Sequence, residues 1–208
     1  MKYDFKHPAH HIGSVRAKAL SAATDILATQ GVDNLNLRAI AEKAGIGLAS
    51  IYHYFSNKEE LLLSLAVMGY EDLRRDIIRF QERREFPTPV AAGARAYFGF
   101  AQARPALFSL MFSERLMARH ESLREAEHKT FLAYQAAVKE DGRFPAAQQA
   151  NVAVALWALG RGIAAMISSQ PDRRLPRELA DQIAAGANYL INHSDQPRTA
   201  PRRSSRRV

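Results

Sequence analysis

One stretch, Asn36–Phe55, constrains the fold of this chain more than any other part of its sequence. Apolar residues repeat at helical spacing in its first half, opposite a charged face, and they are Leu37, Ile40 and Ala41. Gly45 then breaks the pattern, because glycine takes the positive φ that ends a helix. A second short helix is expected over residues 47–54, with Ile51 and Phe55 turned inward. Two short helices joined by a tight glycine turn form a helix-turn-helix, whose second helix enters the major groove of DNA.

The outward face of this motif supplies the candidate DNA contacts, which are Asn36, Arg38, Gly47, Leu48, Ala49, Ser50, Tyr52, His53 and Lys58. Those expected to position the motif on phosphates carry donors near a helix start or on the groove side: Asn36, Ser50, Tyr52 and Lys58. Arg38 and His53 are expected to read base edges, and Arg38 can bond guanine through two donors. Leu48 and Ala49 either meet a thymine methyl or only let the helix approach closely. Core packing is the alternative for the two tyrosines, and we accept it in part for Tyr54 but not for Tyr52.

The same residues resemble the DNA-binding domain of TetR/AcrR-family transcriptional regulators. The resemblance covers roughly residues 14–62 and rests on Leu37-Arg38-x-Ile40-Ala41-x-x-Ala44-Gly45-Ile46, then Ile51-Tyr52-x-Tyr54-Phe55-x-x-Lys58-Glu59-x-Leu61-Leu62. It implies a transcriptional regulator and favours a repressor, with the positioning residues on phosphates. Asn36 stands where Thr is commoner and can still cap a helix. Gly47 stands where Ser is commoner, so a side-chain cap is lost at a small cost in stability.

Composition narrows the class of protein. The chain has 208 residues, of which 47% are hydrophobic, and this is ample for a buried core. It has no cysteine, which excludes disulfides, thiolate metal sites and a Cys nucleophile. No signal peptide is recognisable in Met1–Gly13, and the most apolar stretch, Val152–Leu159, stops at Gly160, so we expect a cytoplasmic protein with no membrane partner. The formal net charge of +8 agrees with a nucleic-acid partner.

The rest of the chain is also expected to be helical, which makes the fold class all-α. The expected helices cover roughly residues 14–30, 58–84, 90–103, 116–140, 146–169 and 177–192, with Gly and Pro at most of the breaks. A short apolar turn is expected over residues 105–113. Ser14 is expected to cap the first helix, and Asn57 with Glu60 to cap the long one. We expect a flexible arm at 1–13, a helix-turn-helix DNA-binding domain at 14–60, a helical effector-binding and dimerisation domain at 61–193, and a disordered basic tail at 194–208.

Two later pieces resemble the C-terminal domain called WHG, which occurs within the same family. The first is Ala96-Tyr97-Phe98-x-Phe100-Ala101-x-x-Arg104-Pro105-Ala106-Leu107-Phe108-x-Leu110-Met111-Phe112, and the second is Trp157-Ala158-Leu159-Gly160-Arg161-Gly162. Arg161 stands where the name of the domain has His. Any role tied to that imidazole therefore does not carry over to this chain.

An apolar pocket between the later helices is the candidate effector site. Its residues are Tyr97, Phe108, Met111, Phe112, Phe131, Tyr134, Trp157 and Arg161. Each apolar one, taken alone, is more often a core residue than a ligand contact. Arg161 could pair with an anionic group of a ligand or with a core carboxylate. We expect an unidentified small apolar effector that shifts the helix after Lys58 and so lowers operator affinity, with no cofactor and no metal.

A homodimer is expected, because one helix-turn-helix makes few base contacts and two can bind the half-sites of a palindromic operator in double-stranded DNA. The candidate interface residues are Ala153, Leu156, Ala187 and Leu190, since small residues beside leucines permit close helix packing. The family resemblance points to a four-helix interface there. The alternative is that these residues only fill the core of the monomer.

Other classes of protein compete with a DNA-binding regulator. An enzyme is disfavoured, because His53, His120 and His128 lack a spaced Asp or Ser partner and no Gly-rich phosphate loop follows a strand. A helical adaptor without sequence-specific DNA binding is the alternative. The histidines near the start, which are His7, His10 and His11, could hold a metal, but a solvated arm is favoured. The Arg-rich tail either adds salt-sensitive affinity for DNA or only solubilises the chain.

Overall fold

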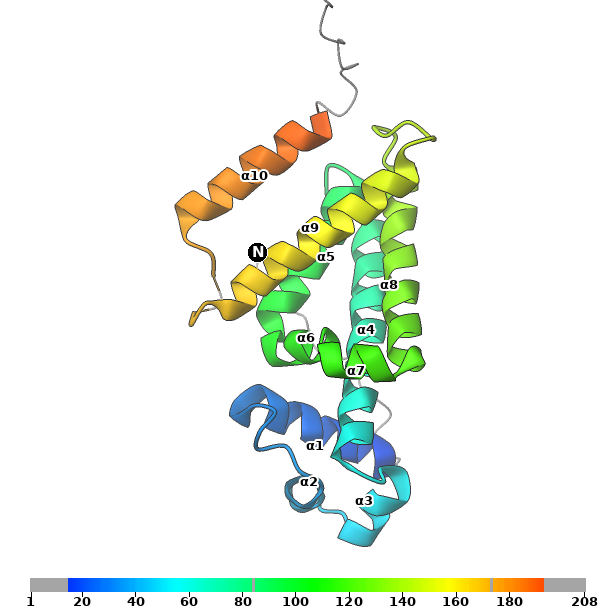
Figure 1. The fold of residues 1–208 in the computed structure, drawn as a ribbon, viewed down its shortest axis with the longest axis vertical. Coiled ribbons are helices and arrows are strands. Elements are labelled where there is room, and N and C mark those ends of the chain that lie inside the picture. The colour runs from blue at the N-terminus through cyan, green and yellow to red at the C-terminus, as the bar shows by residue number, and fades with distance from the viewer. Residues whose placement is uncertain (1–14, 84, 173, 193–208) are drawn as a thin grey trace, which may run out of the picture. The chain divides into compact units, whose positions relative to one another are not determined.

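Every regular element in the residues that the structure describes is an α-helix (Figure 1). The structure is a computed structural model, and it describes residues 15–83, 85–172 and 174–192. The chain divides into two compact units, residues 1–174 and 175–208. The all-α fold class expected from the sequence is confirmed. The expectations for the arm at 1–13, for Ser14 as a cap and for the tail at 194–208 lie outside the described residues.

The N-terminal part of the first unit, called the head here, is built from α1 (Val15–Gln30), α2 (Leu37–Ala44) and α3 (Leu48–Tyr54). Gly31, at φ 81°, follows α1 and turns the chain toward α2. Four of the inward side chains expected from the periodicity are no more than 2% exposed, and these are Ile26, Ile40, Ile51 and Phe55. These residues are part of one hydrophobic core that continues into the rest of the unit, and they pack α2 and α3 against α1.

A single long helix, α4 (Lys58–Glu82), runs from the head into the rest of the unit (Figure 1). Its start is closed as expected, because the side chain of Asn57 accepts a hydrogen bond from the amide of Glu60 at 2.9 Å. The amide of Ser56 in turn donates to Glu60 Oε2 at 2.8 Å, which gives a variant of the capping box. Leu61 and Leu65 near its start are fully buried, and so are Leu73 and Ile77 further along the helix. The helix therefore continues the hydrophobic core from the head into the rest of the unit.

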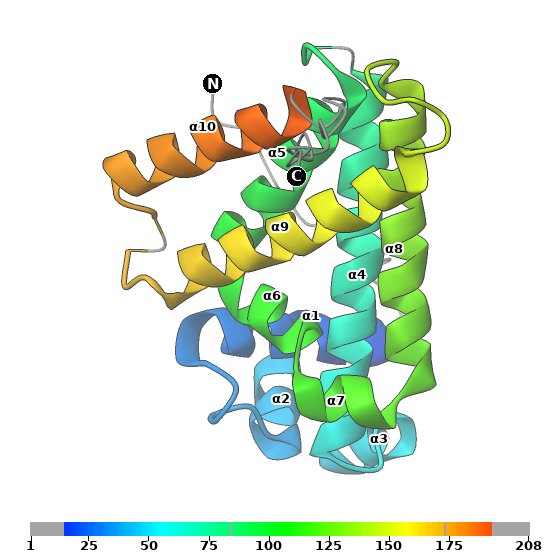
Figure 2. The same cartoon turned by 45° about the horizontal axis from the view of Figure 1, so that its top comes forward.

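The body of the unit packs around α4 and consists of α5 (Pro89–Ala103), α6 (Pro105–Met111), α7 (Glu114–Arg119), α8 (Glu121–Glu140) and α9 (Gln149–Ser169). Helices α5, α6 and α8 contact α4 directly, and α9 lies across α5 and α8 (Figure 2). The expected single helix over 116–140 is wrong. His120, at φ −120° and ψ 110°, is extended and separates α7 from α8. No Gly or Pro marks this break, so periodicity alone did not reveal it.

Helix α6 approaches α4 most closely at Gly69. A Cβ atom on Gly69 would lie 2.7 Å from the sulfur of Met111 and 3.2 Å from Cγ of Leu107, both on α6. A contact this short requires a neighbouring group to shift, so the glycine lets α6 lie on α4 without displacing the Met111 side chain. Met111 is fully buried at this crossing. Any displacement of α6 therefore changes its contacts with α4 at Gly69.

A buried carboxylate joins α4 to the turn between α5 and α6. Asp72, whose side chain is 1% exposed, accepts hydrogen bonds from Arg75 on its own helix and from Arg104 Nη1 at 3.1 Å. Arg104 is the residue that precedes α6, and its guanidinium lies 4.9 Å from the ring centroid of Phe100. The Arg104-Pro105 break seen in the sequence is thus anchored to α4 by an ion pair.

The second unit contains α10 (Arg177–Asn192), whose bounds agree with the expected helix. Glu178 lies in its first turn, where a negative charge is favourable beside the helix dipole. Most of its described side chains are exposed, including that of Tyr189 at 63%.

Candidate functional site

The turn between α2 and α3 has the geometry that the sequence predicts. Asn36 caps α2, because its side chain accepts a hydrogen bond from the amide of Ala39 at 2.9 Å. Gly45 takes the left-handed conformation at φ 63°, and the amide of Ile46 then donates to the carbonyl of Ala41 at 2.9 Å. This is the glycine-ended pattern in which the last carbonyls of a helix are satisfied by the residues after it. Gly47 starts α3 without a side-chain cap, as expected.

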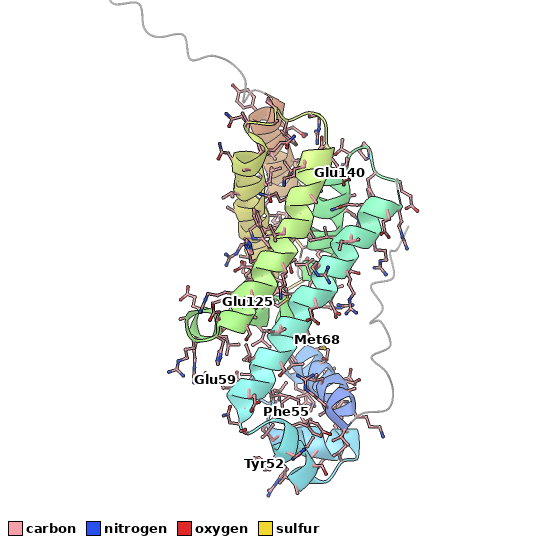
Figure 3. All side chains as sticks on the ribbon, turned by 90° about the vertical axis from the view of Figure 1, so that its right-hand side faces the viewer. Tyr52, Phe55, Glu59, Met68, Glu125 and Glu140 are labelled. Carbon is pink, nitrogen blue, oxygen red and sulfur yellow. The ribbon has the colours of Figure 1, made fainter. Side chains whose placement is uncertain are left out.

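Helix α3 presents one buried and one exposed face. Ile51 is fully buried, whereas Ala49, Ser50 and His53 are exposed. Tyr52 is 54% exposed and lies at the outer end of the head, away from the body (Figure 3). The exposed side chains of α3 are therefore two tyrosine rings, two small residues and one imidazole. Such a surface can enter a groove without steric obstruction.

Three of the expected DNA-contact residues make contacts with other residues of the protein. Leu48 is half-buried and packs against the core, so its side chain is not simply turned outward. Asn36 uses its oxygen for the cap and donates from Nδ2 to the carbonyl of Asn34 at 3.3 Å. Lys58 Nζ donates to the carbonyl of Val32 at 2.9 Å, which ties the start of α4 to the loop after α1. Asn36 and Lys58 thus hold the surface in shape, and Tyr52 is the most exposed of the head's large apolar side chains.

Tyr54 and Arg38 complete the description of this surface. Tyr54 is 38% exposed, less than Tyr52, and its ring meets that of His53 edge-on at 5.2 Å. Arg38 is exposed on α2, on the same head. The structure therefore brings Arg38, Ser50, Tyr52 and His53 to the surface of one small domain.

A three-helix head with a glycine-turn helix-turn-helix, carried by a long helix on a helical body, defines the class of helix-turn-helix regulators. The family model described as "Bacterial regulatory proteins, tetR family" matches residues 19–65. A second, "Tetracyclin repressor-like, C-terminal domain", matches residues 90–187, which include both later motifs. The chain belongs to the tetR family of bacterial regulatory proteins.

Curated relatives agree with this assignment. The HTH-type transcriptional regulator Rv1816 of Mycobacterium tuberculosis is 31% identical over 109 residues, which are 51% of this chain and 47% of that protein. The HTH-type transcriptional regulator BetI of Agrobacterium fabrum is 38% identical over 65 residues, 31% of this chain and 32% of that protein. The matches thus span about half the length of these relatives or less. The family and these relatives are transcriptional regulators, which confirms the expectation that the chain is not an enzyme.

Solved structures share the fold. A protein of unknown function from Rhodococcus sp. RHA1 superposes with a TM-score of 0.68 at 27% identity, over 90% of this chain and 98% of that one. The complex of SmeT with triclosan superposes with a TM-score of 0.55 at 20% identity, over 82% and 90% of the two chains. Helical packing in the body is therefore shared well beyond recognisable sequence similarity.

The aromatic residues predicted for the effector site gather around Trp157 on α9. Its ring lies 5.3 Å from that of Tyr97, 5.8 Å from that of Phe131 and 5.9 Å from that of Tyr134. Tyr97 in turn meets the ring of Phe108 edge-on at 5.6 Å. Three helices, α5, α8 and α9, thus contribute rings to one cluster, which α6 closes on one side.

Arg161 has a partner that the sequence did not identify. Its Nη1 atom lies 3.3 Å from Oε1 of Glu127 on α8, so the alternative of a carboxylate partner within the protein is the one observed. The guanidinium also lies 4.5 Å from the ring centroid of Phe112. Arg161 and Phe112 line an open groove of about 550 Å³, together with Phe108, Ser109, Gly162, Ala165 and Ser169. Of the predicted set, Phe108, Phe112 and Arg161 line this groove. The others do not line it: Tyr97, Phe131, Tyr134 and Trp157 belong to the ring cluster, and the sulfur of Met111 packs over Gly69.

A cluster of charges joins the start of α4 to α7, and we call it the Glu59 cluster. Glu59 accepts hydrogen bonds from Arg115 at 2.7 Å and from Arg119 at 3.4 Å, and lies 3.1 Å from Nε2 of His120. The hydrogen bond with His120, followed by that of Arg115, holds the pKa of Glu59 below its ordinary value. Sequence analysis missed this contact, because its members lie more than fifty residues apart. The cluster links the first turn of α4, next to the head, to α7 and to His120 after it.

Replacing Glu59 by glutamine is expected to lower stability at neutral pH. The lowered pKa of Glu59 means that its ionised form stabilises the folded chain above its unfolded pKa, and this stability is lost as pH falls through its folded pKa. Glu60→Gln is the matched control, since glutamine keeps the capping box and removes the same charge one residue away. Urea unfolding from pH 7 to pH 3 should show a gap between the two variants that closes in acid. Equal midpoints at pH 7 would contradict a role for the cluster.

The candidate dimer residues have different surroundings. Ala153 is fully buried within its own chain, Leu156 and Ala187 are half-buried, and the side chain of Leu190 lies outside the described residues. The large exposed apolar side chains of α9 are instead Val154 at 59%, Met166 at 39% and Leu159 at 37%. By length and composition alone, the segment Gln149–Ile167 could cross a membrane, with a mean hydropathy of 1.6, so the apolar stretch does not stop at Gly160 as expected. Among the described residues no group of three His, Asp or Glu could hold a metal ion.

Proposed function

We propose that this protein is a homodimeric repressor that binds a palindromic operator in double-stranded DNA and is released by a small apolar effector in the cytoplasm. The observation that carries the DNA-binding part is the exposed face of α3, held outward by the Gly45 turn and by the buried Ile51. Arg38, Ser50 and His53 supply donors on that surface, and Tyr52 supplies both a ring and a hydroxyl. Lys58 and Asn36 position the surface from within the head.

Sequence-specific binding by so short a helix needs two copies. Helix α3 has seven residues, which reach only a few base pairs, so useful affinity comes from two heads on half-sites about 34–36 Å apart or a multiple of this. The exposed apolar residues of α9 support an interface between copies, since a second chain would remove them from water. We propose that α9 and α10 of each copy form it. Sedimentation analysis at micromolar concentration should give a dimer.

Selection of bound sequences from a pool of random duplex DNA tests the DNA-binding part. We expect one enriched sequence with twofold symmetry, bound at least about a thousandfold more tightly than random duplex, as is typical of specific regulators. Binding should weaken steeply between 50 and 200 mM salt, because phosphate contacts release counterions. Equal binding to all duplexes would favour the alternative, a helical adaptor without sequence-specific DNA binding.

The route from effector to operator is proposed to pass through α6. Phe108 and Phe112 line the groove at one side of α6, and Met111 packs on Gly69 of α4 at the other. A ligand that displaces these rings therefore moves the helix that rests on Gly69. Because α4 also carries the buried contacts of the head, its movement changes the separation of the two α3 helices in the dimer. The triclosan found in the SmeT complex is a small molecule bound to a protein of this fold.

Replacing Gly69 by alanine is expected to weaken operator binding about tenfold in the absence of any effector. The new methyl group would meet Met111 and Leu107, and overpacking of this kind typically costs about 1–3 kcal/mol. Part of that strain is relieved by a shift of α4 against α6. Gly160→Ala is the control, because a Cβ there meets only the ring of Tyr97, at 3.7 Å. Unchanged operator affinity with a lower unfolding midpoint would show that the clash is absorbed locally.

A further inference from the structure

Two buried hydroxyl groups beside the effector groove have no hydrogen-bond partner. Tyr70 on α4 is 0% exposed and Tyr97 on α5 is 3% exposed, and the hydroxyl of neither is bonded to any protein atom. Buried polar groups are bonded in the large majority of cases, and each exception destabilises the fold. Both tyrosines meet rings that line the groove, so the two exceptions call for an explanation.

The two hydroxyls share one electrostatic environment. Burial raises the pKa of both tyrosines well above the ordinary value, so both hydroxyls remain protonated and uncharged at physiological pH. The negative charge of Glu127 and the positive charge of Arg161 act on both of them, and Tyr97 acts on Tyr70. Each hydroxyl is therefore a neutral donor close to the Arg161–Glu127 ion pair.

The rings that line the groove also touch these tyrosines. Tyr97 meets Phe108 edge-on at 5.6 Å, and Tyr70 meets Phe112 edge-on at 5.6 Å. The groove, of about 550 Å³, has the size of pockets that hold small ligands. Phe112 is half-buried at the end of α6, and the side chain of Arg161 above it is 45% exposed. These two side chains can move aside, and their movement would connect the groove to the hydroxyls.

The charge of the site indicates an uncharged ligand. Arg161 already has the carboxylate of Glu127 at 3.3 Å, so the pair sums to zero. An anionic or cationic group brought among these rings would be buried without a counter-charge, which is strongly unfavourable. What the site lacks is an acceptor for two neutral O–H donors.

We propose that the effector is an uncharged apolar molecule with one hydrogen-bond-accepting oxygen, as in a ketone, which bonds to the hydroxyls of Tyr70 and Tyr97. Its apolar part lies in the groove against Phe108 and Phe112. This inference rests on the proposed function, because it specifies the ligand class of the effector site. The bound oxygen satisfies both donors, and the displaced Phe112 moves the end of α6.

Fluorescence of Trp157 tests this directly in the full-length protein. It is the single tryptophan of the chain, and its ring lies 5.3 Å from that of Tyr97. Three probes of matched shape are titrated: cyclohexyl methyl ketone, isopropylcyclohexane and cyclohexanecarboxylate. We expect the ketone to bind at least about tenfold more tightly than either of the others, as two hydrogen bonds would give. Equal binding of ketone and hydrocarbon, tightest binding of the carboxylate, or binding of none would each overturn the proposal.

Phenylalanine variants separate recognition from structure. Tyr70→Phe and Tyr97→Phe should each reduce the preference for the ketone at least about threefold and leave the hydrocarbon unaffected. Without probe, neither should lower the thermal midpoint, because no hydrogen bond is lost. Tyr134→Phe, in the same aromatic cluster, is the control and should keep the preference. A lowered midpoint with an unchanged preference would assign the hydroxyls a structural role. Operator binding is measured without probe, so failure of the proposed function would be seen separately.

Discussion

Replacing Tyr52 by alanine is expected to abolish specific operator binding while the protein remains folded. Tyr52 is 54% exposed on the outer face of α3, so its removal should change the free energy of unfolding by no more than about 0.5 kcal/mol. Exposed aromatic residues at the centre of an interface commonly contribute about 2 kcal/mol or more to binding. In a symmetric dimer the loss occurs in both heads, so operator affinity should fall at least about a hundredfold. Gel retardation and urea unfolding of the same preparation measure the two effects.

Two further variants show what the side chain contributes. Tyr52→Phe keeps the ring and removes the hydroxyl. A roughly tenfold loss of operator affinity in this variant would indicate that the hydroxyl donates a hydrogen bond to a phosphate. Ile51→Ala, one residue away and fully buried, should lose binding by a different cause, because emptying the head core costs about 2–5 kcal/mol of stability. If Tyr52→Ala bound the operator within about twofold of the native protein, α3 would not be the DNA-contacting helix.

The head could be predicted residue by residue because its determinants are local. Asn36 caps the helix that begins at the next residue, Gly45 ends that helix, and Ile51 and Phe55 repeat at helical spacing. Each feature involves residues fewer than five positions apart, and propensity and periodicity report on that range. One contact at the edge of the head was not foreseen from the sequence. Lys58 reaches the carbonyl of Val32, and such a contact depends on how α1 and α4 cross.

The body was predicted less completely because its decisive contacts join distant residues. The break at His120 carries no Gly or Pro, and the imidazole there meets Glu59 across sixty-one positions. Arg161 was identified, but its partner Glu127 was not, since nothing in either local sequence distinguishes that glutamate from its neighbours. Tyr70 was not singled out at all, because an unpartnered buried hydroxyl is recognised only in three dimensions. These are the contacts through which the effector site and the head are proposed to communicate.

Replacing Asp72 by asparagine is expected to have the largest effect on stability. Its carboxylate is almost fully buried and bonds to Arg104, whose side chain is only 10% exposed. The change removes the negative charge that faces this buried guanidinium, and breaking one side of a buried ion pair costs about 3–5 kcal/mol. Because Arg104 is the residue before α6, the α5–α6 turn should also loosen from α4. Urea unfolding measures the loss, and the single tryptophan provides the signal.

Asp76→Asn is the matched control, one turn further along the same helix. Asp76 pairs with Arg79 on α4 itself at 2.7 Å, and its Oδ2 atom is buried without a partner. Burial raises the pKa of Asp76, so the folded chain binds this proton more tightly than the unfolded chain does. Its ionised form therefore lowers stability at neutral pH, and stability is regained as pH falls through the folded pKa. Asp76→Asn should cost far less than Asp72→Asn, or even stabilise. Equal losses would show that burial, and not the link between α4 and the turn before α6, makes Asp72 important.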